Sequence, residues 1–278
     1  MIPFLKMHGL GNDFVVLDQR ERPLSLDADA VKALADRHTG IGCDQVIEIL
    51  PAHNPEADFL MRIRNRDGGE AEACGNATRC LAYLFWRESG AKRVAIETAA
   101  GLLFAEVRAA DRIAVDMGKA KTLWNEIPLS RPADTLAVDL ALGPLSRPCC
   151  SNIGNPHATF FIAEAESVDL AVWGPRLETD PLFPERANIG VASLLGNGRI
   201  RLRVWERGAG LTRACGSAAC AALVAACRRG LTGPAAAVEL DGGSLDILWR
   251  EDGHVLMTGP AALSFEGRFE PSHFAKGA

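Results

Sequence analysis

The sequence predicts an α+β protein of two similar halves, each a mainly antiparallel β-sheet or barrel around one central helix. A cysteine, a glycine and a small polar residue precede an apolar run twice, at Cys74-Gly75-Asn76 and at Cys215-Gly216-Ser217. A stretch of alternating apolar and basic residues comes before each copy, and other polar residues recur in the same order. Self-similarity of this kind indicates an internal duplication.

The spacing of matching residues supports the duplication. Cys74 and Cys215 lie 141 positions apart, and two asparagine or glutamine positions nearer the start of each half recur at 143. The matched pairs are Asn12 with Asn155, Gln45 with Asn188, Asn65 with Glu206, and Cys74 with Cys215. Four pairs in one order indicate pseudo-symmetric domains.

The first half has the pattern of alternating strands and two helices. Val31, Leu34 and Ala35 fall at helical spacing and predict a helix over 26–38. A second helix follows Cys74 and ends at Gly90, since glycine commonly terminates helices. Period-two alternation and turn residues predict strands over 14–17, 45–50, 59–64, 94–98, 102–107 and 113–117.

The second half repeats this order. Helical spacing predicts a helical piece over 168–177, and the run after Cys215 predicts a helix that ends at Gly230. Strands are expected over 158–162, 189–194, 200–205, 238–240, 245–249, 255–258 and 263–269. Asn76 and Ser217 are expected to accept hydrogen bonds from the amides of the first helical turns.

Four prolines between 119 and 148 mark the passage between the halves. The expected domains are therefore 1–118 and 119–262, with 263–278 returning to the first. The active site is expected in a cleft where the two helix N-termini meet.

Composition narrows the class of protein. The chain has 278 residues, 48% hydrophobic and 23% charged, with a net charge of −5. A net negative charge offers no general attraction to nucleic acid or to an anionic membrane. Residues 1–8 lack the apolar core of a signal peptide, so the eight cysteines are expected as reduced thiols in the cytoplasm. No Cys-x-x-Cys pair is present, and no metal site is expected.

Cys74 and Cys215 suit proton transfer at a carbon atom. A helix N-terminus stabilises a thiolate below its usual pKa of about 8.5. One thiolate can remove a proton from one face of a carbon while a second thiol delivers a proton to the other, which inverts a stereocentre without a cofactor. The alternative is a purely structural role, in which both cysteines are small buried residues of the core. Their duplicated setting favours function, whereas Cys80, Cys220 and Cys227 are expected in the core.

Glu206 and Arg207 end a predicted strand, and two interpretations are open. They can form a solvated pair at a loop, or bind the ammonium and carboxylate of an amino acid. Asparagines favour turns in any case, so Asn12, Asn65, Asn155 and Asn188 are weak signals singly. His157 is more typical of a loop histidine than of an acid or base.

Together these motifs resemble the diaminopimelate epimerase family across both halves. The matching segments are 6–14, 37–45, 65–80, 154–157, Asn188, 205–208, Thr212 and 214–217. The family often has threonine where Ser217 stands. The resemblance implies that the protein interconverts LL- and meso-diaminopimelate, a step on the route to lysine and cell-wall peptide. It also implies that the reaction uses no pyridoxal phosphate, metal or other cofactor. It also implies a homodimer that binds a small molecule rather than nucleic acid or membrane.

The resemblance also implies roles for individual residues. Cys74 and Cys215 are the acid and base, supported by His157 and Glu206. The amides of Gly75-Asn76 and Gly216-Ser217 hold the carboxylate of the reacting centre. The remaining contacts to the amino and carboxylate groups come from Asn12, Gln45, Asn65, Asn155, Asn188, Glu206 and Arg207.

Three other functions stay open at this point. Proline or hydroxyproline racemisation would use the same two thiols but a site closed around a small ring. A thiol hydrolase would pair Cys74 with His157 and would not need Cys215. A redox-sensing or metal-binding module would instead pair the two cysteines with each other.

Overall fold

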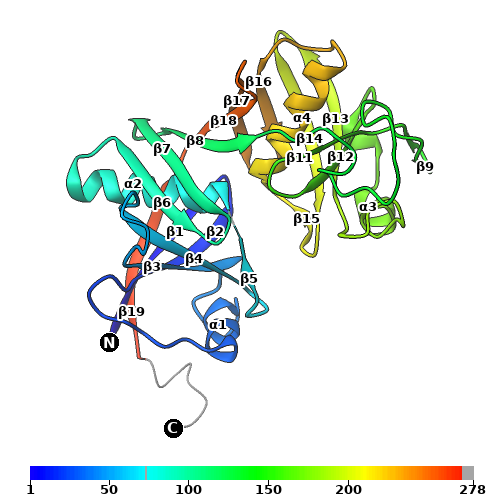
Figure 1. The fold of residues 1–278 in the computed structure, drawn as a ribbon. Coiled ribbons are helices and arrows are strands. Elements are labelled where there is room, and N and C mark those ends of the chain that lie inside the picture. Colours follow the sequence, from blue (N-terminus) through cyan, green and yellow to red (C-terminus); the bar gives the residue numbers. More distant parts are fainter. Residues whose placement is uncertain (73, 271–278) are drawn as a thin grey trace. The chain divides into compact units, whose positions relative to one another are not determined.

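The computed structural model describes residues 1–72 and 74–270. The chain packs as two units (Figure 1). Unit 1 consists of residues 1–115 and the chain from Gly259 on, and unit 2 consists of residues 116–258. β19 (Ala262–Phe269) pairs with β1 (Ile2–Gly9), so the chain returns to unit 1 after unit 2. The last part of the predicted returning segment, 271–278, lies outside the described residues.

Unit 1 is a sheet in which most neighbouring strands are antiparallel. Its pairings run β19, β1, β2, β3, β4, β6, β7, and only the pairs β2–β3 and β4–β6 are parallel. The remaining elements are β2 (Asn12–Asp18), α1 (Ala28–Ala35), β3 (Gln45–Leu50), β4 (Phe59–Asn65), β5 (Glu70–Ala71), α2 (Gly75–Ser89), β6 (Arg93–Thr98) and β7 (Gly101–Ala109). β8 (Arg112–Lys119) leads out of the unit.

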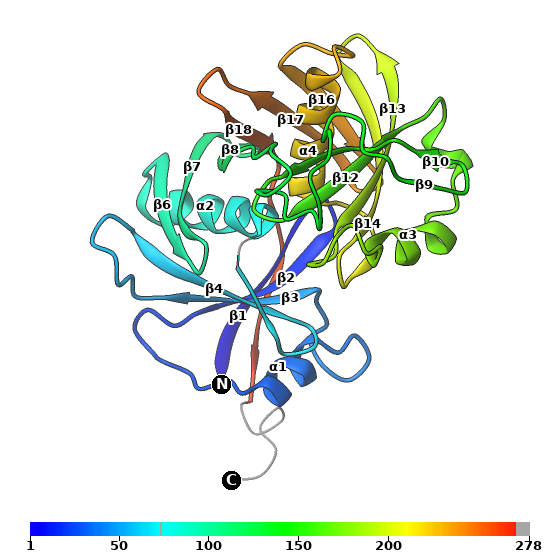
Figure 2. The same ribbon diagram turned by 45° about the vertical axis from the view of Figure 1, so that its right-hand side comes forward.

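Helix α2 is the central helix of unit 1. It packs against β1, β6 and β7, which lie towards opposite ends of the strand order, so the sheet curves around it. Figure 2 shows α2 in cyan beside β6 and β7. Cys80 and Leu81 are buried on its packed face. Gly90 ends the helix with φ of 75°, a left-handed conformation that glycine adopts without a steric penalty.

Unit 2 repeats the arrangement. Its pairings run β11, β12, β13, β14, β16, β17, β18, with β12–β13 and β14–β16 parallel and the others antiparallel. The elements are β9 (Ala141–Leu142), β10 (Leu145–Ser146), β11 (Cys149–Asn152), β12 (Pro156–Phe161), a 3₁₀ turn (Ala165–Ser167), α3 (Leu170–Glu178), β13 (Asn188–Gly196), β14 (Arg199–Glu206), β15 (Gly210–Thr212), α4 (Gly216–Arg228), β16 (Ala235–Leu240), β17 (Gly243–Trp249) and β18 (His254–Gly259). Helix α4 packs against β11, β12, β16 and β17.

The duplication predicted from sequence is confirmed by these pairings. β3 is parallel to β2 in unit 1, as β13 is to β12 in unit 2. β4 and β14 each pair with a short antiparallel strand, β5 or β15, and with the next long strand, β6 or β16, in parallel. Registers agree as well: Phe14 lies opposite Gln45 in unit 1, and His157 lies opposite Asn188 in unit 2. The α+β class of two repeated halves is therefore correct.

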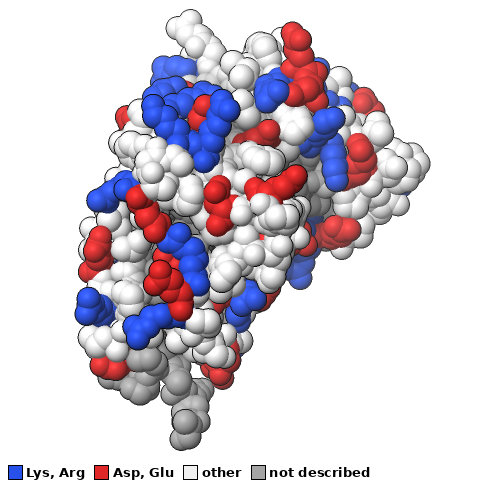
Figure 3. Space-filling model, turned by 60° about the vertical axis from the view of Figure 1, so that its left-hand side comes forward, with Lys and Arg blue, Asp and Glu red and all other residues white. Residues whose placement is uncertain are grey.

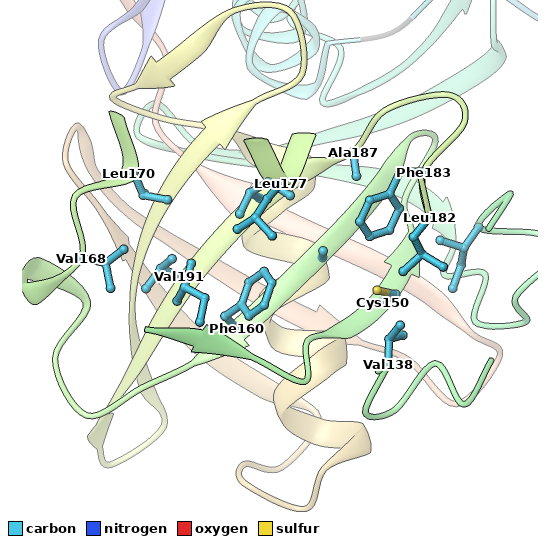
Figure 4. Close-up of a cluster of buried hydrophobic side chains, with 14 of the residues drawn as sticks. Val138, Cys150, Phe160, Val168, Leu170, Leu177, Leu182, Phe183, Ala187 and Val191 are labelled. Atoms are coloured by element: carbon cyan, nitrogen blue, oxygen red, sulfur yellow. The ribbon is translucent and has the colours of Figure 1, made fainter. Parts of the chain in front are cut away.

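The core of unit 2 beyond α4 is an apolar cluster under α3 (Figure 4). Leu170 and Leu177 on α3 point towards Phe160 and Val191 of the sheet, and all four are fully buried. Burying side chains of this size contributes roughly 1.5–3 kcal/mol each relative to exposure. The cluster therefore fixes α3 and the strands β12 and β13, whose ends carry several of the polar residues discussed below.

Some local predictions differ from the structure. The strands β1 and β11 were not predicted. Helix α1 is shorter than the predicted range of 26–38: Asp27 accepts from the Ala30 amide at its start, and the helix ends before Asp36. Cys74 and Cys215 themselves are the N-cap residues, without a side-chain cap bond, so Asn76 and Ser217 are not the caps. Cys227 is half-buried rather than a core residue.

The surface carries charges of both signs. On the face shown in Figure 3, lysines and arginines alternate with aspartates and glutamates. Among the described residues, no helix combines the length and the hydropathy required to cross a bilayer.

Candidate functional site

Cys74 stands at the N-terminus of α2 in an extended conformation, with φ −148° and ψ 105°. The first-turn amides of α2 point towards this end, where the helix dipole is positive. Gly75 and Asn76 follow as the first buried residues of the helix. The local sequence thus delivers a partly exposed thiol beside the anion-binding end of a helix, as predicted.

Asn12 lies beside this thiol. The Cys74 Sγ is 3.8 Å from Asn12 Oδ1, and the Asn76 Nδ2 donates to the same oxygen at 3.1 Å. Asn12 begins β2 directly after the β1–β2 turn, in which Gly11 has φ of 86°. The turn therefore brings a residue 62 positions away in sequence to the cysteine.

Gln45 and Asn65 form a second polar pair in unit 1. They lie opposite each other on β3 and β4, and Gln45 Nε2 donates to Asn65 Oδ1 at 2.9 Å. Gln45 Oε1 is buried and has no hydrogen-bond partner among the described residues. Leaving a buried acceptor unsatisfied costs about 1–3 kcal/mol, so this oxygen is available to a ligand that carries a donor.

Cys215 stands in the same position at the start of α4, with φ −125° and ψ 110°. Cys215 is less accessible to solvent than Cys74, since it is only 5% exposed. The Cys215 Sγ is 3.5 Å from Ser217 Oγ. The duplicated backbone therefore presents a second thiol in an equivalent local geometry.

The expectation of a stabilised thiolate is wrong for Cys215. Burial raises the pKa of this thiol well above its usual value, and the negative charge of Glu206 raises it further. The Ser217 hydroxyl and the Ala218 amide act in the opposite direction but do not outweigh desolvation. Cys215 is therefore a protonated thiol at neutral pH.

Glu206 and Arg207 follow one another at the end of β14 but differ in setting. Glu206 is half-buried and accepts from the Thr212 hydroxyl on β15. Arg207 is exposed, its amide donates to Asn188 Oδ1 at 3.0 Å, and its guanidinium donates to the Glu185 carbonyl at 3.1 Å. The two charges are thus held by separate contacts, and Thr212 is a partner for which sequence reasoning assigned no role.

His157 is buried, at 2% exposure, and its Nε2 lies 2.7 Å from Asn155 Oδ1. Desolvation, with a smaller effect from the positive charge of Arg207, lowers the pKa of His157 to about 3. The imidazole is therefore neutral, and pairing with the Asn155 carbonyl requires the proton on Nε2. The interpretation of His157 as an ordinary loop histidine is wrong, because it lies inside β12.

Asn188 is also buried and links two backbone segments. Its Nδ2 donates to the Pro156 carbonyl at 3.0 Å, while its Oδ1 accepts from the Arg207 amide. Each unit thus gathers its own share of the predicted residues: Asn12, Cys74 and Asn76, with the Gln45–Asn65 pair, in unit 1; Cys215 with Ser217 and Glu206, Asn155 with His157, and Asn188 with Arg207 in unit 2.

Comparison with known sequences identifies close relatives. A family model for diaminopimelate epimerase matches residues 4–123 and 149–264. The diaminopimelate epimerase of Rhodospirillum centenum is 60% identical over 264 residues, spanning 95% of this chain and 91% of that protein. The diaminopimelate epimerase of Acidiphilium cryptum is 56% identical over 273 residues, spanning 98% of both.

Solved structures share the fold at low sequence identity. A probable proline racemase from Agrobacterium radiobacter has a TM-score of 0.69 at 17% identity, covering 100% of this chain and 97% of that chain. A hydroxyproline epimerase from Agrobacterium vitis has a TM-score of 0.69 at 16% identity, covering 96% and 91%. At this level of identity the likeness concerns the fold alone.

Proposed function

The chain belongs to the diaminopimelate epimerase family, and from this premise we propose that it interconverts LL-2,6-diaminopimelate and meso-diaminopimelate. It does so without pyridoxal phosphate or a metal ion, as an isomerase of the route to lysine and cell-wall peptide. The observation that carries the proposal is the repeated geometry: each half presents a cysteine as the N-cap of its central helix. The proposal requires both thiols to reach the same α-carbon.

In the proposed reaction, one cysteine removes the α-proton as a thiolate and the other donates its S–H proton to the opposite face. The C–H bond breaks towards the first sulfur, and the electron pair is carried by the α-carbon and its carboxylate until the second proton arrives. Cys74 and Cys215 exchange these roles with the direction of reaction. In the direction in which Cys215 acts as the acid, its raised pKa keeps the proton that it must donate.

The carboxylate of the reacting centre is proposed to bind the first-turn amides of both helices, at Gly75-Asn76 and Gly216-Ser217. Backbone amides at a helix N-terminus bind anions well. They also stabilise the negative charge that develops as the proton leaves. This arrangement accounts for a glycine directly after each cysteine.

The remaining polar groups are proposed to hold the amino and carboxylate groups of the substrate. The unpartnered Gln45 Oε1 supports this assignment, because a substrate ammonium would satisfy it. Glu206 suits an ammonium and Arg207 a carboxylate. The full proposed set is Asn12, Gln45, Asn65, Asn155, Asn188, Glu206 and Arg207.

His157 and Glu206 are proposed to support catalysis in different ways. The low pKa of His157 makes it a poor proton donor at neutral pH, so it acts by orienting Asn155. Burial keeps the proton on Cys215 in the unliganded protein, and the negative charge of Glu206 adds to this effect. We further propose that the protein works in the cytoplasm as a homodimer with the domains 1–118 plus 263–278 and 119–262.

A proton NMR time course in deuterated water tests the function. The reduced protein is incubated with LL-diaminopimelate, with L-proline in a parallel sample, and the α-proton signals are followed. Deuterium at the α-carbon of diaminopimelate with formation of the meso isomer supports the proposal. If proline exchanges its α-proton and diaminopimelate does not, the two-thiol reaction is supported but the proposed substrate is wrong. Absence of exchange with both would reject the two-thiol mechanism.

A further inference from the structure

A directed chain of hydrogen bonds runs through unit 1 beside Cys74. Arg79 Nη2 donates to Asn76 Oδ1 at 2.9 Å, and Asn76 Nδ2 donates to Asn12 Oδ1 at 3.1 Å. Asn12 Nδ2 then donates to Asp44 Oδ2 at 3.0 Å. Two side-chain amides thus connect a guanidinium to a carboxylate.

The two ends of this chain decide its direction. A guanidinium can only donate hydrogen bonds, and an ionised carboxylate can only accept them. Asn76 must therefore turn its carbonyl oxygen to Arg79, and Asn12 must turn its amino group to Asp44. Both constraints leave the Asn12 carbonyl oxygen on the side of Cys74 Sγ, 3.8 Å away. An amide between neutral partners could take either orientation.

Both ends are themselves held in place. Arg79 is completely buried, and its Nε donates to the Pro260 carbonyl at 3.1 Å. Gly9 leaves room for the guanidinium, since a Cβ on Gly9 would lie 2.8 Å from Arg79 Nη2. Asp44 accepts from the Asp13 amide at 3.2 Å and from Arg37 Nη2 at 2.8 Å.

We propose that Asp44 and Arg79 are positioning residues that fix the Asn76–Asn12 amide pair in one orientation, so that a carbonyl oxygen faces Cys74. An acceptor stabilises the protonated thiol relative to the thiolate, because it accepts from S–H and repels a negative sulfur. The pair therefore counteracts the helix N-terminus, which favours the thiolate. Cys74 is held as a neutral thiol in the unliganded protein.

The proposed function gives this restraint a purpose, and this part of the inference rests on it. A substrate ammonium is a stronger donor than a thiol and competes for Asn12 Oδ1. Once that oxygen accepts from the substrate, it no longer favours the protonated form of Cys74. Binding of the substrate's amino group therefore lets the partly exposed Cys74 thiol lose its proton to solvent water, so the thiolate forms only when the substrate is present.

The test is the rate at which iodoacetamide alkylates Cys74 in the full chain without substrate, followed by mass spectrometry of the Cys74 peptide from pH 6 to 10. In Asp44→Asn the end group can donate as well as accept, so the amide pair is held in one direction from the Arg79 end alone. The expected result is alkylation about tenfold faster than in the parent protein at low pH, with the two rates converging at high pH. Convergence separates the effect from loosened structure, which would raise the rate at every pH.

Two further variants keep the test decisive. Arg37→Gln removes the exposed ion pair of Asp44 but leaves its bond to Asn12, so the alkylation profile should match the parent protein. Gly9→Ala acts at the other end, where the new Cβ would lie 2.8 Å from Arg79 Nη2 and 3.1 Å from Asn76 Cβ, and it should speed alkylation at low pH without touching Asp44. If Asp44→Asn does not fold, as judged by the loss of its cooperative thermal transition, Gly9→Ala provides the test instead.

The proposal is overturned if a folded Asp44→Asn and a folded Gly9→Ala both show the parent profile, or if Arg37→Gln gives the same acceleration as Asp44→Asn. Failure of the proposed function looks different. In that case diaminopimelate would not exchange its α-proton in the parent protein, while the alkylation profiles would still separate Asp44→Asn from Arg37→Gln.

Discussion

The two thiol sites share a backbone but not their neighbours. Each unit places an asparagine, Asn12 or Asn155, directly after a glycine with positive φ in a turn, between β1 and β2 in unit 1 and between β11 and β12 in unit 2. In unit 1 the Asn12 oxygen faces the thiol and the amide is held by Asp44 and Asn76. In unit 2 the oxygen of Asn155 pairs with the neutral His157.

The partners in one unit have no equivalents in the other. Phe14, fully buried, occupies the position of His157, since each lies opposite the first residue of the parallel strand. Ala187 stands where Asp44 does, one residue before that strand, and Cys220 stands where Arg79 does, five residues after the cysteine. The duplication therefore conserved a geometry while each half acquired its own means of orienting an amide.

The largest effect is expected from removing either thiol. If the two sites are equivalent in the proposed reaction, Cys74→Ala and Cys215→Ala should each lower epimerisation by about 10²–10⁴-fold or more. The rates are measured by the NMR assay above, with Cys80→Ala, a buried cysteine one and a half turns into α2, as the matched control. An active Cys215→Ala variant would break the symmetry between the sites and favour a single-cysteine mechanism.

His157→Phe gives unit 2 the residue that unit 1 has at this position. Native His157 stays unprotonated down to about pH 3, whereas an unfolded histidine binds a proton near its usual pKa of 6.5. Between these values the unfolded state binds more protons, so stability falls as the pH falls, by up to about 1.4 kcal/mol per pH unit. His157→Phe should flatten this slope in urea unfolding at pH 4 to 7. An unchanged slope would show that His157 is protonated in the native protein.

Glu206→Gln tests the different resting state of Cys215. Removing the carboxylate charge removes one cause of the raised pKa, so alkylation of Cys215 at pH 8 should become about tenfold faster. Burial remains, and the rate should stay below that of an exposed cysteine. Glu185→Gln is the control, because Glu185 is exposed and contacts Arg207 only through its carbonyl. Equal acceleration in both variants would argue against a local effect of Glu206.

The smallest effect is expected from Arg37→Gln. Arg37 is 51% exposed and pairs with Asp13 and Asp44 at the edge of the unit 1 site. Exposed ion pairs contribute about 0–1 kcal/mol, so the free energy of unfolding should change by less than about 1 kcal/mol. Lys6→Met sharpens the comparison, because Lys6 is buried and pairs with the half-buried Asp13, which would keep only its contact with the exposed Arg37. Its cost in the same urea experiment is expected to exceed that of Arg37→Gln, since a less exposed ion pair is less screened by solvent.

Much of the fold could be predicted because its signals are local. Alternating strands such as 59–64 and 200–205, the helix stop at Gly90 and the repeated Cys-Gly step are properties of neighbouring residues. β1 and β11 were missed for the same reason. β1 contains Pro3 and does not alternate strictly, and β11 is only Cys149–Asn152, so both are strands because a neighbouring strand completes their hydrogen bonds.

By itself the sequence determined the duplicated architecture, the pair of cysteines at helix N-termini and the family to which the chain is similar, because periodicity, turn residues and motif spacing are written in its order. Only the tertiary structure decided the protonation of Cys215 and His157 and the direction of the Asn12 amide. Those properties depend on desolvation and on partners distant in sequence, such as Glu206 for Cys215 and Asp44 for Asn12. The spacing of residues in the sequence shows neither how deeply a group is buried nor which distant residues contact it.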